Sequence, residues 1–543
     1  MNTHTVEQSI TSQLLDAILN SSTPEHRYRA IHDIHATYAA QNVSIVYPEP
    51  TNGGIIDIAM IGQQDYGAIK LSERTNFNGW TFRVTTSTIY PPSGEQFLFY
   101  FQKYRSEQDI IPIAPTRREI DTGCFHDVEG MTDALCLVEI QDQNTWTFRN
   151  DTPNTYVGQL PWSNWNENDP IKRKDILLVK NKEAVNRPIA PYNTVMSEPT
   201  CQYVLVNSRE KVFENVTFER TSNCAVRVNL LHSFYTNNIT IRNVTVITDD
   251  PSAFVKDCCI NIGNATNVRL ENINFATKLY STETAAGYGI QLNNVWNVKM
   301  VNLQASKPIW GVVGTNNVNH MELEGVPDGQ ATDPVFQLNR LDIHCYGRDI
   351  ICKNCTFTNE TNTTQYTFHT LNRFSSLMGY LRYENCVFDG FRPVRMDTGY
   401  NAFMGYDLYF KNCTVVVRRS QFNYLLDMGF WGAPRNQRLE LRKKCWPNIT
   451  IENMILKVND DINQIDLYHL LDRGVYTDGI DYLEHIKIRN LEWKHLNGIS
   501  LSPSEINNKV FAISNKSVTA NQLYHAFIEG VNVPYTNTIN NHV

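Results

Sequence analysis

Apolar and polar residues alternate in short runs along the second half of the chain, and an asparagine interrupts each run. In ITIRNVTV, for example, Ile239 and Ile241 precede Asn243, while Val244 and Val246 follow it. A period of two predicts β-strands, because successive side chains of a strand point to opposite sides. The unit recurs every 23 to 41 residues, at Asn215, Asn243, Asn272, Asn302, Asn354, Asn385, Asn412, Asn453 and Asn490, with Gly325 in the one position that lacks asparagine. This spacing predicts coils of short strands joined by loops of changing length.

Asparagine suits a corner between two strands, because it tolerates the left-handed backbone conformation and can hydrogen-bond to nearby backbone. Stacked coils with parallel strands about 4.8 Å apart would align these asparagines as a ladder and the inward apolar residues as columns. Cys355, Cys386 and Cys413 each follow a marker asparagine directly. We therefore expect these cysteines to stack as one column inside the coils.

The repeat resembles the right-handed parallel β-helix of the pectate-lyase-like superfamily, which includes polysaccharide-degrading enzymes and phage tailspikes. The resemblance covers residues 200 to 500 and implies an all-β fold. That fold is a right-handed single-stranded parallel β-helix, expected here with an N-terminal helical cap and long loop insertions. The stretches 288–296, 339–349 and 76–84 are also similar to those of secreted β-helix proteins of gut Bacteroidetes. Since this fold hosts lyases, hydrolases, esterases and noncatalytic spikes, it predicts architecture more closely than reaction.

The pattern divides the chain into four regions. Residues 1–54 predict a helical cap and a first strand, and residues 55–200 predict irregular first coils with a tryptophan-bearing insertion at 121–172. The regular β-helix is expected over 201–500. Residues 501–543 are expected to form a C-terminal cap and tail, in which SVTANQLYHAFIEG predicts a short helix.

Composition narrows the range of partners and compartments. A net charge of -8 without a long basic block argues against a general nucleic-acid binder. No apolar run reaches the length of about 18 residues that a membrane span needs. The first residues, MNTHTVEQSITSQ, lack the basic start and apolar stretch of a secretory signal. The resemblance implies a secreted, cell-surface or periplasmic protein, which would have lost its signal or would leave the cell by another route, as a phage protein does at lysis.

Cysteine and acidic residues give no pattern of a metal site. Cys352 and Cys355 form a CxxC spacing, but period two places them on opposite sides of the strand and corner, and no second CxxC exists. Cys124 and Cys136 could form a disulfide. Related lyases use calcium, but the acidic pairs Asp249-Asp250 and Asp460-Asp461 read as turn residues, so we expect no obligatory cofactor or metal, with calcium the one ion that the resemblance allows.

Polar residues converge on the outward positions of three predicted coils. In NRLDIHCYGRD the apolar residues face inward by alternation, so Arg340, Asp342 and His344 point outward together. Asp342 and Arg373 each lie twelve residues before a marker asparagine, which places them side by side on adjacent coils. The predicted catalytic patch comprises Arg340, Asp342, His344, Tyr346, Arg373, Arg395 and Asp397. The alternative is a plain ion-pair ladder that only stabilises an exposed face.

Other residues are candidates for holding a sugar chain beside this patch. Gln291 and Asn293 lie in YGIQLNNVW two coils earlier, with Tyr288 at its start. Aromatic faces in the long insertions could stack on sugar rings, although the tryptophans could equally pack a cap of their own. The predicted substrate-binding residues are Tyr288, Gln291, Asn293, Tyr400, Trp162, Trp165 and Trp431.

A lyase is the preferred mechanism for these residues. Arg373, with Arg340 or Arg395, would neutralise a uronate carboxylate and make the neighbouring carbon acid easier to deprotonate. His344 is the preferred base, and Tyr346 or Tyr400 is the acid that would assist the leaving oxygen. The excess of arginine over aspartate favours an acidic, uronic-acid-containing polysaccharide as the partner.

Two alternatives stay open. An inverting glycoside hydrolase would use Asp342 and Asp397, which strands two coils apart would place about 9 to 10 Å apart at the backbone, close to the window of roughly 6.5 to 9.5 Å between the carboxyl groups of such enzymes. The arginine beside Asp342 disfavours this role, since it stabilises the charged form of a carboxyl that must be held protonated. The other alternative is a noncatalytic glycan-binding adhesin or tailspike module. We expect a monomer, or a homotrimer in the case of a spike.

Overall fold

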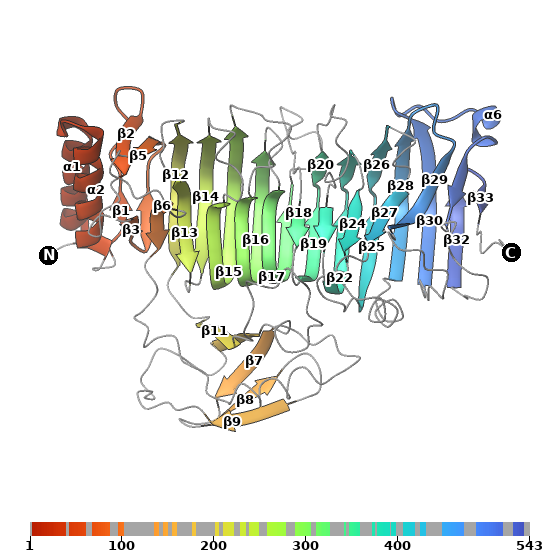
Figure 1. The fold of residues 1–543 in the computed structure, drawn as a ribbon, viewed down its shortest axis with the longest axis horizontal. Coiled ribbons are helices and arrows are strands. Elements are labelled where there is room, and N and C mark those ends of the chain that lie inside the picture. The colour runs from red at the N-terminus through yellow and green to blue at the C-terminus, as the bar shows by residue number, and fades with distance from the viewer. Residues whose placement is uncertain are drawn as a thin grey trace.

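The computed structural model describes the chain in segments. These are residues 3–39, 43–60, 68–86, 96–101, 135–140, 145–149, 155–159, 176–180, 201–205, 210–221, 228–234, 238–248, 258–277, 288–305, 311–325, 341–343, 347–358, 372–374, 377–390, 393–397, 405–418, 424–429, 448–471, 485–513 and 525–536. Most of their strands join one large sheet in which every pairing is parallel. Figure 1 shows the strands stacked along the long axis, with the N-terminus at one end and the C-terminus at the other. The fold is the single-stranded parallel β-helix that the repeat predicts.

Each coil contributes strands to three stacks, which we name faces A, B and C in chain order. Face A contains β3 (Ile69–Leu71), β6 (Gln96–Phe101), β13 (Val228–Phe234), the first parts of β15 (Cys258–Thr277), β16 (Tyr288–Ala305) and β17 (Gly311–Glu324), and then β18 (Leu341–Ile343), β21 (Asn372–Phe374), β24 (Val394–Asp397), β27 (Tyr424–Gly429), β29 (Gln464–Leu471), β31 (Val510–Ala512) and β33 (Tyr535–Thr536).

Face B follows face A across a first corner. It contains β1 (Ile45–Val46), β4 (Arg74–Asn76), the first parts of β12 (Lys211–Arg220) and β14 (Ile239–Thr248), the later parts of β15, β16 and β17, and then β19 (Gly347–Lys353), β22 (Leu377–Glu384), β25 (Gly405–Lys411), β28 (Asn448–Val458), β30 (His485–His495) and β32 (His525–Val531).

Face C lies beyond the marker asparagines. It contains β2 (Ile55–Met60), β5 (Thr81–Thr86), the ends of β12, β14, β15 and β16, then β20 (Thr356–Thr358), β23 (Val387–Asp389), β26 (Thr414–Val417), and the ends of β28 and β30.

The asparagine ladder forms as predicted. Each marker asparagine has a positive φ, from 53° at Asn272 to 62° at Asn215. Its side-chain amide donates to the amide oxygen of the preceding coil, as Asn412 does to Asn385 at 3.0 Å. Asn76 of β4 extends the ladder by one coil, because it accepts from Asn215 at 2.9 Å. Gly325 interrupts it: φ is not positive there, and an added Cβ would lie 1.9 Å from the main-chain oxygen of Asn354.

The inward columns build a continuous apolar core from the helices to the last coils. Cys355, Cys386 and Cys413 are buried within it, as predicted. The prediction that Cys352 points away from Cys355 is wrong, because both are buried in the same core. The left-handed corner at Asn354 turns the chain between them, so the two thiols face the interior from faces B and C.

Helices α1 (Thr3–Asn20) and α2 (Pro24–Ala39) cover the first coil, as expected (Figure 1). Leu14 of α1 and Ile31 of α2 are buried in the common core. His35 of α2 is also buried, with Nε2 at 2.9 Å from the hydroxyl of Tyr47. Burial lowers the pKa of His35 to about 3, so a neutral imidazole joins the cap to the coil.

Two predicted boundaries change. The chain between β6 and β12 holds a separate five-stranded antiparallel sheet of β7 (Leu135–Ile140), β8 (Thr145–Arg149), β9 (Thr155–Gln159), β10 (Ile176–Lys180) and β11 (Cys201–Leu205), so the insertion is longer than 121–172. The coils also continue beyond residue 500. The helix expected near residue 525 is wrong, because His525–Val531 is strand β32, paired with β30. A short helix, α6 (Pro503–Ile506), precedes it.

Candidate functional site

One register position of face A carries polar residues across almost the whole β-helix. Neighbouring strands align these residues one beside the next, and we call them the face A row. The residues that flank Asp342 and Gln291, which are Leu341 and Ile343, and Ile290 and Leu292, lie in the core, so alternation directs Asp342 and Gln291 away from the interior. The row comprises Tyr100, His232, Asn261, Gln291, Gly314, Asp342, Arg373, Arg395, Asp427 and His469.

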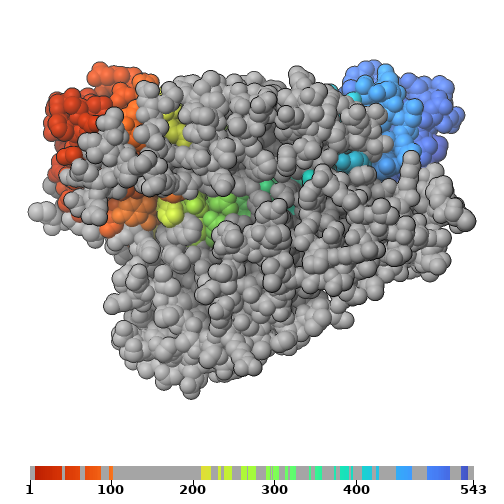
Figure 2. Space-filling view, in the orientation of Figure 1, coloured from red at the N-terminus to blue at the C-terminus, as the bar shows by residue number. Residues whose placement is uncertain are grey.

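The predicted adjacency of Asp342 and Arg373 is confirmed by the pairing of β18 with β21. Arg395 lies beside Arg373 on the next strand. Asp342 is fully buried and Arg395 is only 9% exposed, although neither position faces the core. From the side drawn in Figure 2, the described residues of the middle coils reach the surface only as a narrow band. The side chains of Asp342 and Arg395 are therefore enclosed rather than spread on an open face.

The predicted placement of Asp397 opposite Asp342 needs correction. Arg395, not Asp397, shares the row with Asp342, and Asp397 lies two residues further along β24, beside Gly429. Two strand spacings and two residues along the strand separate the Asp342 and Asp397 backbones by about 12 Å. A longer corner before Asn412 caused the error, because counting back from that asparagine does not give the true register.

The sequence missed six members of the row: Tyr100, His232, Asn261, Gly314, Asp427 and His469. β27 aligns Asp427 with Arg395, and β29 aligns His469 with Asp427. Asp427 lies 26 residues before Asn453, whereas Asp342 lies twelve before Asn354, so the basic insertion near residue 440 hides the register. The signal that could have found Asp427 is the apolar pair on either side of it, Leu426 and Met428, which matches the apolar residues on either side of Arg395.

The other predicted site residues are placed only in part. Tyr288 begins β16 beside Cys258 and Gly311, and its backbone, like those of Arg373 and Asp397, lies on face A. The remaining predicted residues lie outside the described segments: Arg340, His344, Tyr346, Tyr400, Trp162, Trp165 and Trp431. Their proposed roles stay predictions. Cys124 and the acidic pair Asp249-Asp250 also lie outside these segments.

Gln291 and Asn293 belong to an amide cluster at face A. Gln291 donates to Asn293 at 3.3 Å, and Asn293 donates to Asn261 on the preceding strand at 3.1 Å. Gln291 is 7% exposed, and it occupies the same row as Asp342, two strands earlier. These amides are fixed in place and offer both donors and acceptors.

The N-terminal part of the row is aromatic and uncharged. His232 lies beside Tyr100 in register, and its ring centroid is 4.8 Å from that of Phe97. Partial burial lowers the pKa of His232 and raises the pKa of Tyr100. Both pKa shifts favour the neutral side chains at neutral pH.

Face B provides a contrast, because it carries a strictly alternating charge ladder. Each residue pairs in register with one of opposite sign on the next coil. We name these seven residues the face B ladder: Glu324, Lys353, Glu384, Lys411, Glu452, Arg489 and Glu529. Opposite charges on adjacent strands stabilise a sheet, and like charges destabilise it. The face A row does not follow this rule, since Arg373 and Arg395 are neighbours.

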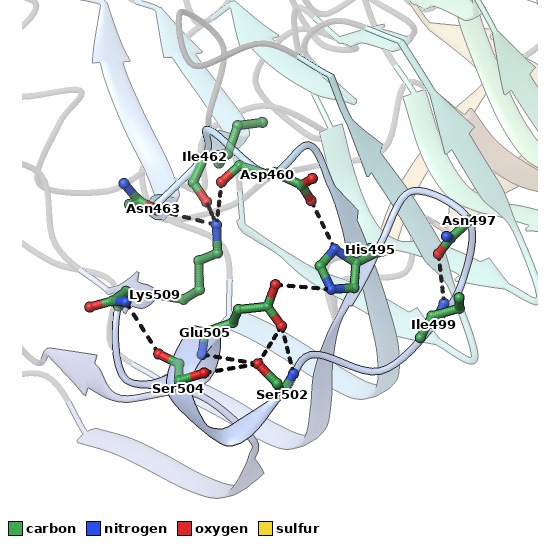
Figure 3. A network of polar contacts seen from close by, with 11 residues as sticks. Asp460, Ile462, Asn463, His495, Asn497, Ile499, Ser502, Ser504, Glu505 and Lys509 are labelled. Atoms are coloured by element: carbon green, nitrogen blue, oxygen red, sulfur yellow. Dashed lines mark hydrogen bonds and ion pairs between the residues drawn. The ribbon is translucent and has the colours of Figure 1, made fainter.

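A polar network that the sequence did not predict joins three elements at the C-terminal end (Figure 3). Its centre is His495, at the end of β30. Its Nδ1 lies 2.8 Å from Asp460 and its Nε2 lies 3.4 Å from Glu505 of α6. Glu505 also accepts from the main-chain nitrogen of Ser502 at 2.8 Å, which completes a capping box.

Hydrogen bonds and charges within the His495 network shift the pKa values of His495 and Glu505. The hydrogen bond with Asp460 is the largest cause that raises the pKa of His495, and Glu505 adds to it. The bond from the Ser502 side chain is the largest cause that lowers the pKa of Glu505. The buried amine of Lys509 donates to the main-chain oxygens of Asp460 and Ile462 at 2.8 and 2.7 Å, which ties α6 to the turn after β28 by a second route.

Within the described segments, no three histidine, cysteine, aspartate or glutamate side chains are grouped so that they could hold a metal ion. Among the helices described, none is long and apolar enough to cross a membrane.

No family model matches the chain, and no curated protein matches its sequence. Among solved structures, the tailspike protein gp49 of Pseudomonas phage LKA1 is similar, with a TM-score of 0.41 and 9% identity over 92% of this chain and 77% of that one. The tailspike gp61 of Pseudomonas phage phi297 is similar with a TM-score of 0.38 and 9% identity, over 88% of this chain and 76% of that one. The fold assignment rests on the strand registers of this chain itself.

Proposed function

We propose that this protein binds an acidic polysaccharide along face A and cleaves it by β-elimination. The observation that carries the proposal is the register of Arg373 beside Arg395, with Asp342 on the next strand. Two guanidinium groups on adjacent strands, about 4.8 Å apart at the backbone, repel each other unless anions lie close. A uronate carboxylate would supply such an anion, in addition to Asp342 beside Arg373 and Asp427 beside Arg395.

The face B ladder supports this interpretation. There the same coils place opposite charges side by side six times in succession, which is the arrangement expected where charge only stabilises the sheet. A purely structural role for the face A row would favour the same alternation. The row instead concentrates positive charge at two adjacent strands, where a bound anion would be stabilised most strongly.

The proposed chemistry follows from that charge. Arg373 and Arg395 would neutralise the substrate carboxylate, which makes the adjacent C–H more acidic. A base, for which His344 is proposed, would take that proton as a carbon–carbon double bond forms. The bond to the leaving glycosidic oxygen then breaks, and that oxygen takes a proton from an acid, for which Tyr346 or Tyr400 is proposed. Asp342 would position the guanidinium groups.

The hydrolase alternative has weaker geometric support. Its two carboxylates would be Asp342 and Asp397, whose backbones lie about 12 Å apart by the corrected register. Inverting hydrolases hold their carboxyl groups roughly 6.5 to 9.5 Å apart.

The proposal extends to location and assembly. Substrates of this size lie outside the cell, so we propose an extracellular or cell-surface site of action. Assembly is proposed as a monomer, or a trimer if the protein is part of a spike. Calcium is the one cofactor that the resemblance allows, and addition of a chelator during the assay below tests for it.

The test is Arg395→Ala, compared with Arg489→Ala of the face B ladder. The purified protein is incubated with a panel of acidic polysaccharides, and ultraviolet absorbance follows unsaturated uronate formation. Arg395→Ala should lower kcat/KM at least about 100-fold, the scale for loss of one group that stabilises developing negative charge. Arg489→Ala should keep the parent rate.

Other outcomes separate the alternatives. Reducing ends that form without the absorbance would support a hydrolase. Tight binding of a polymer with no product of either kind would support a noncatalytic adhesin. An Arg395→Ala variant as active as the parent protein would reject the proposed role of the arginine pair.

A further inference from the structure

Face A changes its chemistry sharply between β17 and β18. After β3, the next five strands of face A are β6, β13 and the first parts of β15, β16 and β17. Their sequences read QFLFYF, VNLLHSF, CCINIGN, YGIQLNN and GVVGTNN, and they contain no aspartate, glutamate, lysine or arginine. Since 19% of the whole chain is charged, about six charged residues would be expected in these 34 positions. Each of the next five strands, from β18 to β29, carries at least one.

The boundary falls at Gly314 in the face A row. On one side lie Tyr100, His232, Asn261 and Gln291, and on the other lie Asp342, Arg373 and Arg395. Four strand spacings separate Asn261 from Arg373, which is about 19 Å. A polysaccharide that lies along the row and contacts both residues must therefore place several sugar units between them. These sugar units lie in different chemical surroundings.

The uncharged half suits hydroxyl groups. Asparagine, glutamine and neutral histidine each offer both a donor and an acceptor, which matches the two-way hydrogen bonding of a sugar hydroxyl. The Gln291, Asn293 and Asn261 amides are already held by one another at 3.3 and 3.1 Å, so little ordering is needed on binding. Tyr100 and His232 add ring surface to the same row.

The same half is unsuited to a carboxylate. Gln291 is 7% exposed and His232 is partly buried, so an anion placed there would lose hydration. The described strands β6, β13 and β16 and the face A parts of β15 and β17 contain no cation to replace that hydration. Lys70, one strand nearer the helical cap, is the nearest basic residue in register, beside Tyr100.

We infer that the uncharged half of the face A row binds neutral sugar units, so that the substrate is a heteropolysaccharide containing both neutral and acidic units. The neutral units lie towards the helical cap, and the acidic unit lies at the arginine pair. This inference rests on the proposed function, since it assigns a substrate class to the same site. It distinguishes the substrate from a homopolymer of uronic acids.

The test measures binding by calorimetry with oligosaccharides of equal length. The alternating probes are hyaluronan and unsulfated chondroitin, and the uniformly acidic probes are polygalacturonate and polymannuronate. The parent protein should bind at least one alternating probe about tenfold or more tightly than either homopolymer. Asn261→Ala should remove about tenfold of that affinity, the scale of one lost hydrogen bond in a desolvated site, and leave homopolymer binding unchanged.

A second variant guards against misfolding. Asn261→Ser removes the amide group but keeps an uncharged oxygen that can accept a hydrogen bond, so the fold should persist. It should show the same selective loss. Lys299→Ala on face B is the control and should bind every probe as the parent does.

Two results would overturn the inference: equal affinity of the parent for alternating and uniform probes, or equal losses for both probe classes in the Asn261 variants. Failure of the proposed function is distinct, because it would appear as no binding to any acidic probe. Since the readout is binding, a failed elimination mechanism alone would leave this test intact.

Discussion

At the scale of single residues, backbone conformation decides which side chain each corner accepts. The marker asparagines adopt φ near 55°, where most residues are disfavoured, and their amides continue the ladder. A second ladder occupies the corner between faces A and B, where Asn297 donates to Asn267 at 2.6 Å and Asn267 to Asn238 at 2.8 Å. His320 and Asp349 continue that corner with φ of 51° each, and they pair at 3.2 Å.

Gly325 is the marker position at which a close contact, and not a positive φ, disfavours a side chain. Gly325→Ala should destabilise the protein by about 2 kcal/mol or more, since the new Cβ would lie 1.9 Å from the Asn354 oxygen and the backbone would have to move. Urea denaturation measures the loss. The matched control is Gly53→Ala, where φ is 81° but nothing lies within 4 Å of the added Cβ. A loss in Gly325→Ala that is no larger than the loss in Gly53→Ala would contradict the expected clash.

The sequence predicted the first ladder but not the second. Asn215 and its equivalents sit at a fixed place within a local alternating pattern, so their role can be read from neighbouring residues. The second corner changes from asparagine to histidine and aspartate at His320 and Asp349, which breaks the sequence repeat while conserving the backbone conformation. The Cys352 error has a similar cause, because strict alternation fails across a left-handed residue.

At the scale of elements, the His495 network fastens α6 to two neighbouring coils. A neutral imidazole has one N–H, so it cannot donate to Asp460 and Glu505 together. Protonated His495 can donate to both. The charged groups that face it are therefore Asp460 from the turn after β28 and Glu505 from α6, while Lys509 contacts the far side of Asp460 through the main chain.

The sign of the pH effect follows. The folded-state pKa of His495 is raised, so its contribution to stability is complete below the unfolded value of about 6.5 and is lost as pH rises through the folded value. Hydrogen exchange of residues 496–513 should therefore quicken, above pH 7, relative to a His495→Gln variant measured at the same pH. A constant ratio between the two proteins from pH 5 to 9 would contradict the prediction.

Element type and register were predictable to different degrees. Asp342 and Arg373 were aligned correctly because both coils have the same length between the row and the marker asparagine. Asp427 and Asp397 were not aligned correctly, because loops of other lengths lie between these residues and the marker asparagines that follow them. The strand pattern does not encode loop length. The strand at 525–531 was mistaken for a helix because its apolar spacing fits both periods until its partner β30 is known.

At the scale of the whole molecule, the face B ladder links coils that are far apart in sequence. Lys411→Glu would place three like charges on adjacent strands, between Glu384 and Glu452. We expect a loss of about 1 kcal/mol relative to Lys411→Met, from repulsion across strands. Urea midpoints at low and high salt measure it, and the difference between the two variants should shrink at high salt. A difference that salt leaves unchanged would rule out repulsion as its cause.

The ladder amides all point one way along the axis. Asn243 donates to Asn215, Asn272 to Asn243, and Asn490 to Asn453, always towards the N-terminal cap. During synthesis on the ribosome, each emerging coil of a ladder run therefore meets an acceptor that earlier residues have already fixed. Gly325 separates two runs, from Asn76 to Asn302 and from Asn354 to Asn490, and within each run assembly can keep pace with translation as vectorial growth from its N-terminal side.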